Sequence, residues 1–107
     1  MQTHSETTRR PNQLTAIVFK EKDHWVAMFL EKYIGAQGRT YAETIERLKI
    51  VYRAELNESI NRTGEAFGGI MRTPKEYQER VDKDKSAMRI TIYDKGSICD
   101  GAALRAA

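Results

Sequence analysis

The sequence predicts an α+β fold of two layers, a two-layer sandwich in which a long helix covers one face of an antiparallel β-sheet. Three observations predict this class: two apolar runs joined by a short polar loop near the N-terminus, an amphipathic stretch in the middle, and an alternating run near the C-terminus. The expected order of elements is β-β-β-α-(α)-β. With 107 residues, the chain has room for one domain of ordinary size.

The first two strands are expected to form a hairpin. From Leu14 to Lys20, β-branched and aromatic residues suit a pleated strand, and Trp25 to Leu30 is apolar throughout. The polar residues 21–24 form the hairpin loop. A third strand follows within 31–39 and ends at Gly38, where we expect a positive φ or a tight bend.

The long helix has a clear start signal. Thr40 is followed three residues later by Glu43, the spacing of a capping box, so we expect a helix from Tyr41 to Arg62. Its apolar residues fall in one stripe about 120° wide, which is typical of a helix that faces a core. The residues of this stripe are Tyr41, Ala42, Ile45, Leu48, Tyr52, Leu56 and Ile60.

Glycines interrupt the pattern after this helix. Residues 63–71 contain three glycines, which predict a loop with Ile70 and Met71 turned inward. Thr73, followed by a proline and a glutamate, repeats the start signal and predicts a short helix over 74–82.

The last predicted element is a half-buried strand from Ala87 to Tyr93, where apolar and polar residues alternate. Residues 14–94 therefore form the expected domain. Residues 1–13 are rich in Thr, Arg and Gln and are interpreted as a flexible N-terminal tail. Residues 95–107 are interpreted as a short C-terminal tail.

Composition indicates a soluble protein of the cytoplasm. The chain is 40% hydrophobic and 31% charged, and no run approaches the roughly 20 apolar residues of a membrane span. We therefore expect no contact with a membrane. The single cysteine, Cys99, cannot form an internal disulfide, which favours a reducing compartment.

The distribution of charge and of reactive side chains argues against several classes of function. The 18 basic and 15 acidic residues give a formal charge of +3, but the two signs are interspersed, so nucleic-acid binding is only a weaker alternative. His4 and His24 lie in a tail and in a hairpin turn, and the spacing suggests no catalytic or metal-binding set. We expect neither enzymatic activity nor a cofactor.

One run resembles a known family. From Trp25 to Glu43, a hairpin strand leads through the turn Ala36 to Thr40 into the amphipathic helix, which resembles the hallmark of HicB-like proteins. The stretch Arg72 to Tyr77 and the strand at 87–94 resemble the end of that domain. The family is the antitoxin half of toxin–antitoxin pairs. The resemblance implies a non-enzymatic inhibitor that masks a protein partner, such as a small ribonuclease toxin.

The sequence departs from the family pattern at three places. Arg39 stands where the family most often has an acidic residue, Glu43 and Thr44 replace the usual Glu-Ala, and 13 residues follow Asp94. Because a DNA-binding module needs several tens of residues, we expect none here. An alternative role is that of a phage-encoded anti-defence protein, which binds a CRISPR complex or sequesters a nucleotide signal between subunits.

The expected binding surface uses aromatic and polar residues near strand ends. An aromatic side chain with a polar group often marks an interface, whereas Phe29 is expected in the core. We also expect a homo-oligomer that assembles through a sheet edge or the C-terminal strand. The candidate partner-binding residues are Trp25, Tyr33, Gln37, Arg39, Arg89 and Tyr93.

Overall fold

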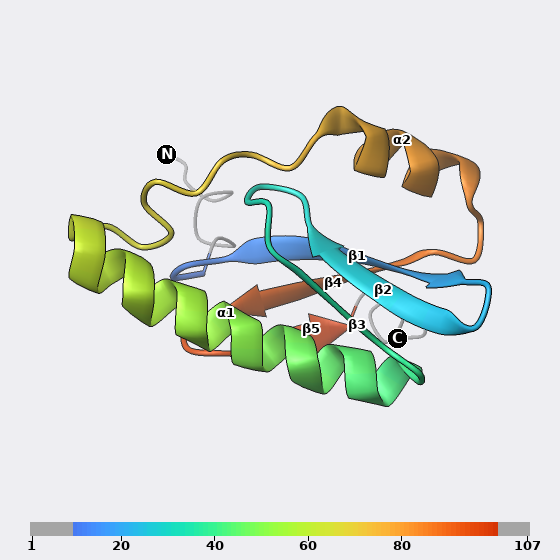
Figure 1. Ribbon diagram of the computed structural model, residues 1–107, viewed down its shortest axis with the longest axis horizontal. Coiled ribbons are helices and arrows are strands. Elements are labelled where there is room, and N and C mark those ends of the chain that lie inside the picture. Colours follow the sequence, from blue (N-terminus) through green and yellow to red (C-terminus); the bar gives the residue numbers. More distant parts are fainter. Residues whose placement is uncertain (1–9, 101–107) are drawn as a thin grey trace, which may run out of the picture.

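The computed structural model describes residues 10–100, and residues 1–9 and 101–107, which include most of both predicted tails, lie outside the described part. The described chain forms five strands and two helices (Figure 1). The α+β class and the antiparallel sheet are confirmed. In chain order the elements are β1 (Leu14–Glu21), β2 (His24–Phe29), β3 (Gly35–Gly38), α1 (Tyr41–Thr63), α2 (Lys75–Lys83), β4 (Met88–Tyr93) and β5 (Ser97–Asp100).

The strands form one antiparallel sheet in the order β3-β2-β1-β4-β5. Strand β1 is central, with β2 on one side and β4 on the other. Strand β5 is an addition to the prediction, which assigns its residues to the C-terminal tail. Four residues are too few to show an alternating pattern, and pairing with β4 is what makes this segment a strand.

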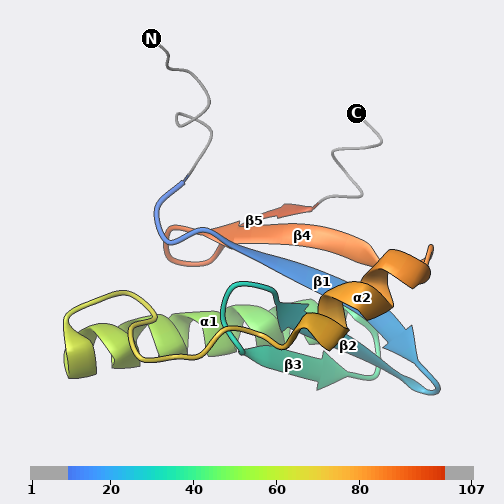
Figure 2. The same cartoon turned by 90° about the horizontal axis from the view of Figure 1, so that it is seen from above.

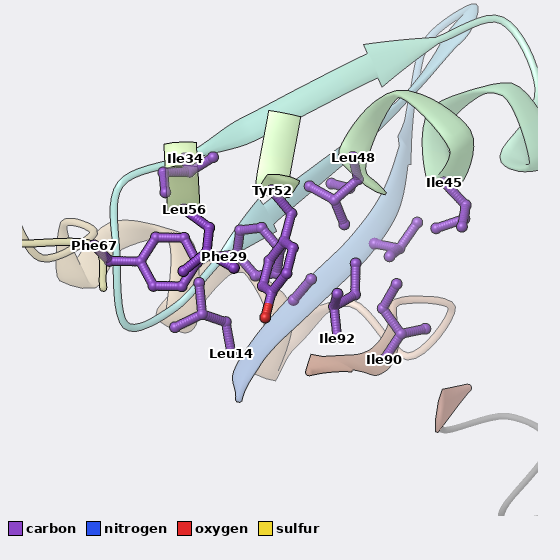
Figure 3. Close-up of a cluster of buried hydrophobic side chains, with 13 residues drawn as sticks. Leu14, Phe29, Ile34, Ile45, Leu48, Tyr52, Leu56, Phe67, Ile90 and Ile92 are labelled. Atoms are coloured by element: carbon purple, nitrogen blue, oxygen red, sulfur yellow. The ribbon is translucent and has the colours of Figure 1, made fainter. Parts of the chain in front are cut away.

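Side chains of α1 pack against one face of the sheet. Ala16 and Val18 of β1 point to this face, as do their neighbours in β2 and β4, and Figure 3 shows Tyr52 of α1 among them. Phe29 lies in this core, as the sequence predicts. The buried members are Leu14, Ala16, Val18, Ala27, Phe29, Ile34, Ile45, Leu48, Tyr52, Leu56, Phe67, Ile90 and Ile92.

Helix α2 packs against the opposite face. Ile17 and Phe19, which alternate along β1 with the residues of the main core, form a second cluster with Val81 of α2. The sheet therefore lies between two helices (Figures 1 and 2). This corrects the prediction of a helix on one face only. The nine residues of α2 hold just two apolar side chains, Tyr77 and Val81, too few to indicate where the helix docks.

Helix α1 starts at the predicted residue and ends one residue beyond the predicted end. Its buried face differs from the predicted stripe, because Ala42 and Ile60 are exposed while Thr44 and Ser59 are buried. Both buried hydroxyls form hydrogen bonds. Thr44 donates to the carbonyl of Thr40 at 2.8 Å, and Ser59 donates to that of Leu56 at 3.0 Å.

The residues just before α1 form an N-terminal cap, and Gly38 in this turn lies close to the helix. The Thr40 hydroxyl accepts a hydrogen bond from the backbone N–H of Glu43 at 3.0 Å, and the Glu43 carboxylate accepts from the N–H of Arg39 at 2.7 Å. Gly38 is absent from the described positions of positive φ, so the first of the two alternatives expected for this residue, a positive φ, does not hold. A Cβ at Gly38 would lie 2.9 Å from Oγ1 of Thr44, so glycine is needed for this close approach.

Thr73 does not cap α2. Pro74 occupies the N-cap position, and no side chain bonds to the first turn. The buried Thr73 hydroxyl instead donates to the carbonyl of Phe29 at the end of β2. The start signal correctly predicts a helix, but its threonine forms a hydrogen bond that links the segment before α2 to the end of β2.

The loop between the helices buries Phe67, which was not predicted, while of the two predicted residues Ile70 packs against the core and Met71 does not. Phe67 is buried with a φ of 58°, whereas Met71 is 64% exposed and Ile70 is only partly buried. The Phe67 ring lies 5.3 Å from the ring of Tyr52, between centroids. Its N–H donates to the buried hydroxyl of Ser59 at 2.6 Å. This contact fixes a backbone conformation that is rare for an aromatic residue.

The last part of the predicted N-terminal tail is bound to the domain. The carbonyl of Pro11 accepts a hydrogen bond from the N–H of Asp94 at 2.6 Å. The Tyr52 hydroxyl donates to the carbonyl of Asn12 at 2.7 Å. Residues 11 and 12 are therefore held against the turn between β4 and β5.

Candidate functional site

An open depression of about 550 Å³ lies beside α2 on the second face of the sheet. Phe19, Val26 and Met28 line it, and the register of β1 and β2 points all three to this face. A Cβ at Gly35 would lie 2.7 Å from Cε of Met28, so glycine leaves room for the methionine to lie across β3. The lining therefore includes an apolar floor built by the sheet.

Helix α2 supplies one wall of this depression through Arg80 and Tyr77. The Arg80 guanidinium lies 4.7 Å from the centroid of the Phe19 ring and pairs with the carboxylate of Glu21. These two opposite charges offset one another, while about half of the Arg80 side chain remains exposed. The wall thus offers N–H donors with little net charge.

Two tyrosines stand together at the rim. The ring centroids of Tyr33 and Tyr77 are 6.0 Å apart. A hydrogen bond to Tyr33, and secondly burial, raise the pKa of Tyr77. Tyr33 is 42% exposed, and its N–H donates to the carbonyl of the exposed Met71 at 2.8 Å. The rim therefore combines aromatic rings and hydroxyl groups.

A smaller depression of about 260 Å³ adjoins the first, and His24 and Gln37 line both. It is also lined by Arg39, Glu43 and Arg47. Arg47 donates to a Glu43 carboxylate oxygen at 3.0 Å and to the carbonyl of Gln37 at 2.9 Å. Within the described chain the Arg39 side chain is in no such ion pair, so its charge is available at the surface.

The structure brings together three of the six predicted binding residues. Tyr33 and Gln37 line the larger depression, and Gln37 and Arg39 line the smaller one. The other three lie elsewhere. Sequence reasoning missed Tyr77 and Arg80 as members of this surface. The three-residue spacing of Tyr77 and Arg80 places them on one side of a helix, which is a signal that could have grouped them.

Trp25, Arg89 and Tyr93 are separate from this surface. The Trp25 ring packs edge-on against Tyr41, 5.6 Å between centroids, on the face that carries the main core. Arg89 pairs at 3.9 Å with Asp82 of α2. The Tyr93 ring lies 4.6 Å from the guanidinium of Arg10. These contacts give the three side chains roles in packing or in local ion and ring contacts.

Among residues 10–100, no group of three or more His, Cys, Asp or Glu side chains has a geometry that could hold a metal ion. Neither helix of that part of the chain has the length and apolar character needed to cross a bilayer. Comparisons of the chain with protein-family models, with curated proteins and with solved structures found no match.

Proposed function

We propose that this protein is a non-enzymatic inhibitor of the HicB-like type, which binds a protein partner and covers a functional surface of that partner. A small ribonuclease toxin is the partner class that the sequence resemblance implies. The resemblance of residues 25–43 to the family hallmark supports this proposal, as does the observed α+β class of the fold.

The observation that carries the proposal is the depression beside α2. An apolar floor with a rim of tyrosine and arginine is the composition in which binding energy concentrates at protein interfaces. Tyr33 at the rim is 42% exposed, so a partner can reach it without any change in the fold. A side chain of the partner would fill the depression and exclude water from the floor.

The proposed mechanism is steric. Binding energy comes from apolar contact with Phe19, Val26 and Met28, and from hydrogen bonds to the donors at the rim. The charge of Arg39 adds orientation and a faster encounter with an acidic group on the partner. The partner is inactive while its surface is covered, and the inhibitor forms no covalent bond.

The test is capture of a partner with a matched pair of variants. Tyr33→Asp places a charge at the rim, whereas Ile50→Asp places the same charge on an exposed residue of α1. We expect the wild type and Ile50→Asp to retain the same host protein. Tyr33→Asp should bind that purified protein at least tenfold more weakly, the scale of one interface hot spot.

Three results would contradict the proposal. The captured protein could bind Tyr33→Asp as well as it binds the wild type. The activity of the captured protein, such as RNA cleavage, could remain unchanged when the wild type is bound. The tagged protein could retain nucleotides or nucleic acid through gel filtration instead of a protein. A nucleotide result would favour the anti-defence role.

Trp25 is a poor probe of this surface, although the sequence suggests it. Because its ring packs on Tyr41 and against the main core, Trp25→Ala would lower stability as well as alter any interface. Arg39→Glu is the better second variant, since Arg39 is exposed at the smaller depression. We expect it to weaken partner binding without unfolding the domain.

A further inference from the structure

Strand β3 forms one edge of the sheet, beside both depressions. The N–H of Phe29 bonds to the carbonyl of Ile34, so alternation along the antiparallel ladder turns the backbone groups of Gly35 and Gln37 outward. The carbonyl of Gln37 accepts from Arg47 at 2.9 Å. No hydrogen bond within the described chain reaches the N–H of Gln37 or either backbone group of Gly35. These three groups are therefore available to another strand.

The residues of β3 do not protect this edge against pairing. Edge strands that avoid pairing typically carry a charged side chain, a proline or a bulge. Strand β3 consists only of glycine, alanine and glutamine, and its register with β2 runs without a bulge. A strand from another molecule therefore meets no charge or kink of β3 itself.

The side chains of an added strand would alternate between the two faces of the sheet. Those level with Gly35 and Gln37 point to the face of the larger depression, because these two residues pair with Met28 and Val26. A Cβ at Gly35 would lie 2.7 Å from Cε of Met28, so the methionine occupies the place of the missing side chain. An apolar side chain of the added strand, level with Gly35, would therefore pack on Met28.

The charge that remains next to the end of β3 is that of Arg39. Glu43 pairs with Arg47, and Glu21 pairs with Arg80, so the charges within each pair offset one another. Arg39 is exposed and belongs to no ion pair of the described chain. An acidic side chain level with Arg39 would complement this charge.

We propose that the protein partner adds an extended segment to β3, with an apolar residue level with Gly35 and an acidic residue level with Arg39. The inference rests on the proposed function, because it names the part of the partner that reaches the depressions. Backbone hydrogen bonds to the three open groups supply affinity, and the two side chains supply selectivity.

Two synthetic peptides test this pairing by NMR titration. In TLTTTDT, leucine and aspartate have the separation of Gly35 and Arg39, and TDTTTLT reverses their order, since an added strand can run in either direction. We expect one of them to bind with a Kd on the order of 0.1 mM. Binding should weaken about fivefold in Arg39→Glu, the scale of one exposed ion pair.

Two controls isolate the charge of Arg39. Arg53→Glu makes the same change on an exposed arginine of α1 and should leave binding unchanged. A lysine in place of the peptide aspartate should restore binding to Arg39→Glu. Equal effects of the two arginine substitutions would overturn the assigned position of the acidic residue.

Backbone readouts distinguish strand addition from other contacts. At about ten times Kd, exchange of the Gly35 and Gln37 amides should slow about tenfold, whereas that of Ala36, which faces β2, should not change. Methylation of the peptide nitrogens, one at a time, should weaken binding about tenfold at alternate positions only, because only those N–H groups face β3.

Failure of both peptides to bind at about 1 mM would overturn the inference, as would methylation effects without alternation. A captured protein that is sensitive to Tyr33→Asp but leaves the Gly35 and Gln37 amides exchanging freely would overturn it while the proposed function stands. Alternating methylation effects without an inhibited protein partner would support the strand site and contradict the proposed function.

Discussion

Tyr52 joins the core to the two ends of the described domain. Its ring lies 5.9 Å from the Phe29 ring and 5.3 Å from that of Phe67, between centroids. Its hydroxyl hydrogen is shared between the carbonyls of Asn12 and Asp94, at 2.7 and 3.2 Å. Burial, and secondly the charge of Asp94, raise the pKa of Tyr52 to about 12. The phenol therefore stays neutral and keeps its donor.

The raised pKa of Tyr52 predicts a loss of stability in alkali. The folded value of about 12 lies above the ordinary value of 10.0, so the contribution is complete below pH 10 and is lost as the pH rises towards 12. The free energy of unfolding of the wild type, relative to Tyr52→Phe, should fall by roughly 1.4 kcal/mol per pH unit in that window.

Urea unfolding of both proteins at a series of pH values measures this difference. At pH 8, Tyr52→Phe should be less stable by about 1–2 kcal/mol, because the carbonyls of Asn12 and Asp94 lose the hydrogen bond from the Tyr52 hydroxyl. The comparison with the phenylalanine variant cancels the ionisation of the lysines and the other tyrosines. A gap between the two proteins that is constant from pH 8 to pH 11.5 would contradict the assigned pKa.

Sequence patterns predict the apolar core residues but miss the buried hydroxyls. The spacing of Ile45, Leu48 and Leu56 places them on the core side of α1, and they lie there. Ser59 is buried because a loop N–H eight residues later bonds to it. That partner comes from tertiary structure, so no helical period indicates it.

At the level of elements, the two helix start signals have different outcomes. Thr40 and Thr73 are each followed three residues later by glutamate, and both precede a helix. Only Thr40 caps its helix, because the hydroxyl of Thr73 lies against the free carbonyl at the end of β2. A local pattern therefore locates a helix reliably but does not specify which acceptor a hydroxyl will find.

Helix α2 is expected to open before the rest of the domain. It has no side-chain cap, and Val81 is its only buried residue. Val81→Ala should cost about 1–2 kcal/mol from lost apolar burial and should speed hydrogen exchange about tenfold in α2, with less effect on α1.

The matched control for α2 is Leu48→Ala in the main core. A buried leucine truncated to alanine typically costs about 2–5 kcal/mol, and this change should speed exchange throughout α1 and the central strands. Native-state hydrogen exchange with urea unfolding measures both quantities. Equal effects of the two substitutions on α1 and α2 would show that the domain opens only as a whole.

At the scale of the whole molecule, charge contributes little to stability. In each described ion pair at least one side chain is about half exposed or more, and the formal charge of the chain is +3. Exposed pairs contribute about 0–1 kcal/mol and are screened by salt.

The free energy of unfolding should therefore change by less than about 1 kcal/mol between about 0.1 M and about 1 M sodium chloride. Urea unfolding at the two ionic strengths measures it. Glu21→Gln is an informative companion, since Glu21 is the better buried member of its pair with Arg80. A loss of several kcal/mol in high salt would mean that the surface pairs act as a network.

The candidate surface could be predicted only where its parts are close in sequence. Tyr33, Gln37 and Arg39 lie within one short segment, and the pairing of β3 with β2 keeps the first two beside one depression. Tyr77 and Arg80 join them only because α2 crosses the second face of the sheet. Because α2 has only two apolar side chains, its sequence does not indicate which face of the sheet it packs against.

The central position of β1 has a consequence for the order of synthesis. Ile17 pairs with Met28 of β2 and with Arg89 of β4, so its second neighbour leaves the ribosome long after the first. Until Ile90 and Ile92 emerge, the edge of β1 that pairs with β4 has no partner strand, and the main core lacks these two residues. Pairings between distant segments form slowly and leave strands open to misassembly. The arrival of β4 is thus the point at which the growing chain becomes protected.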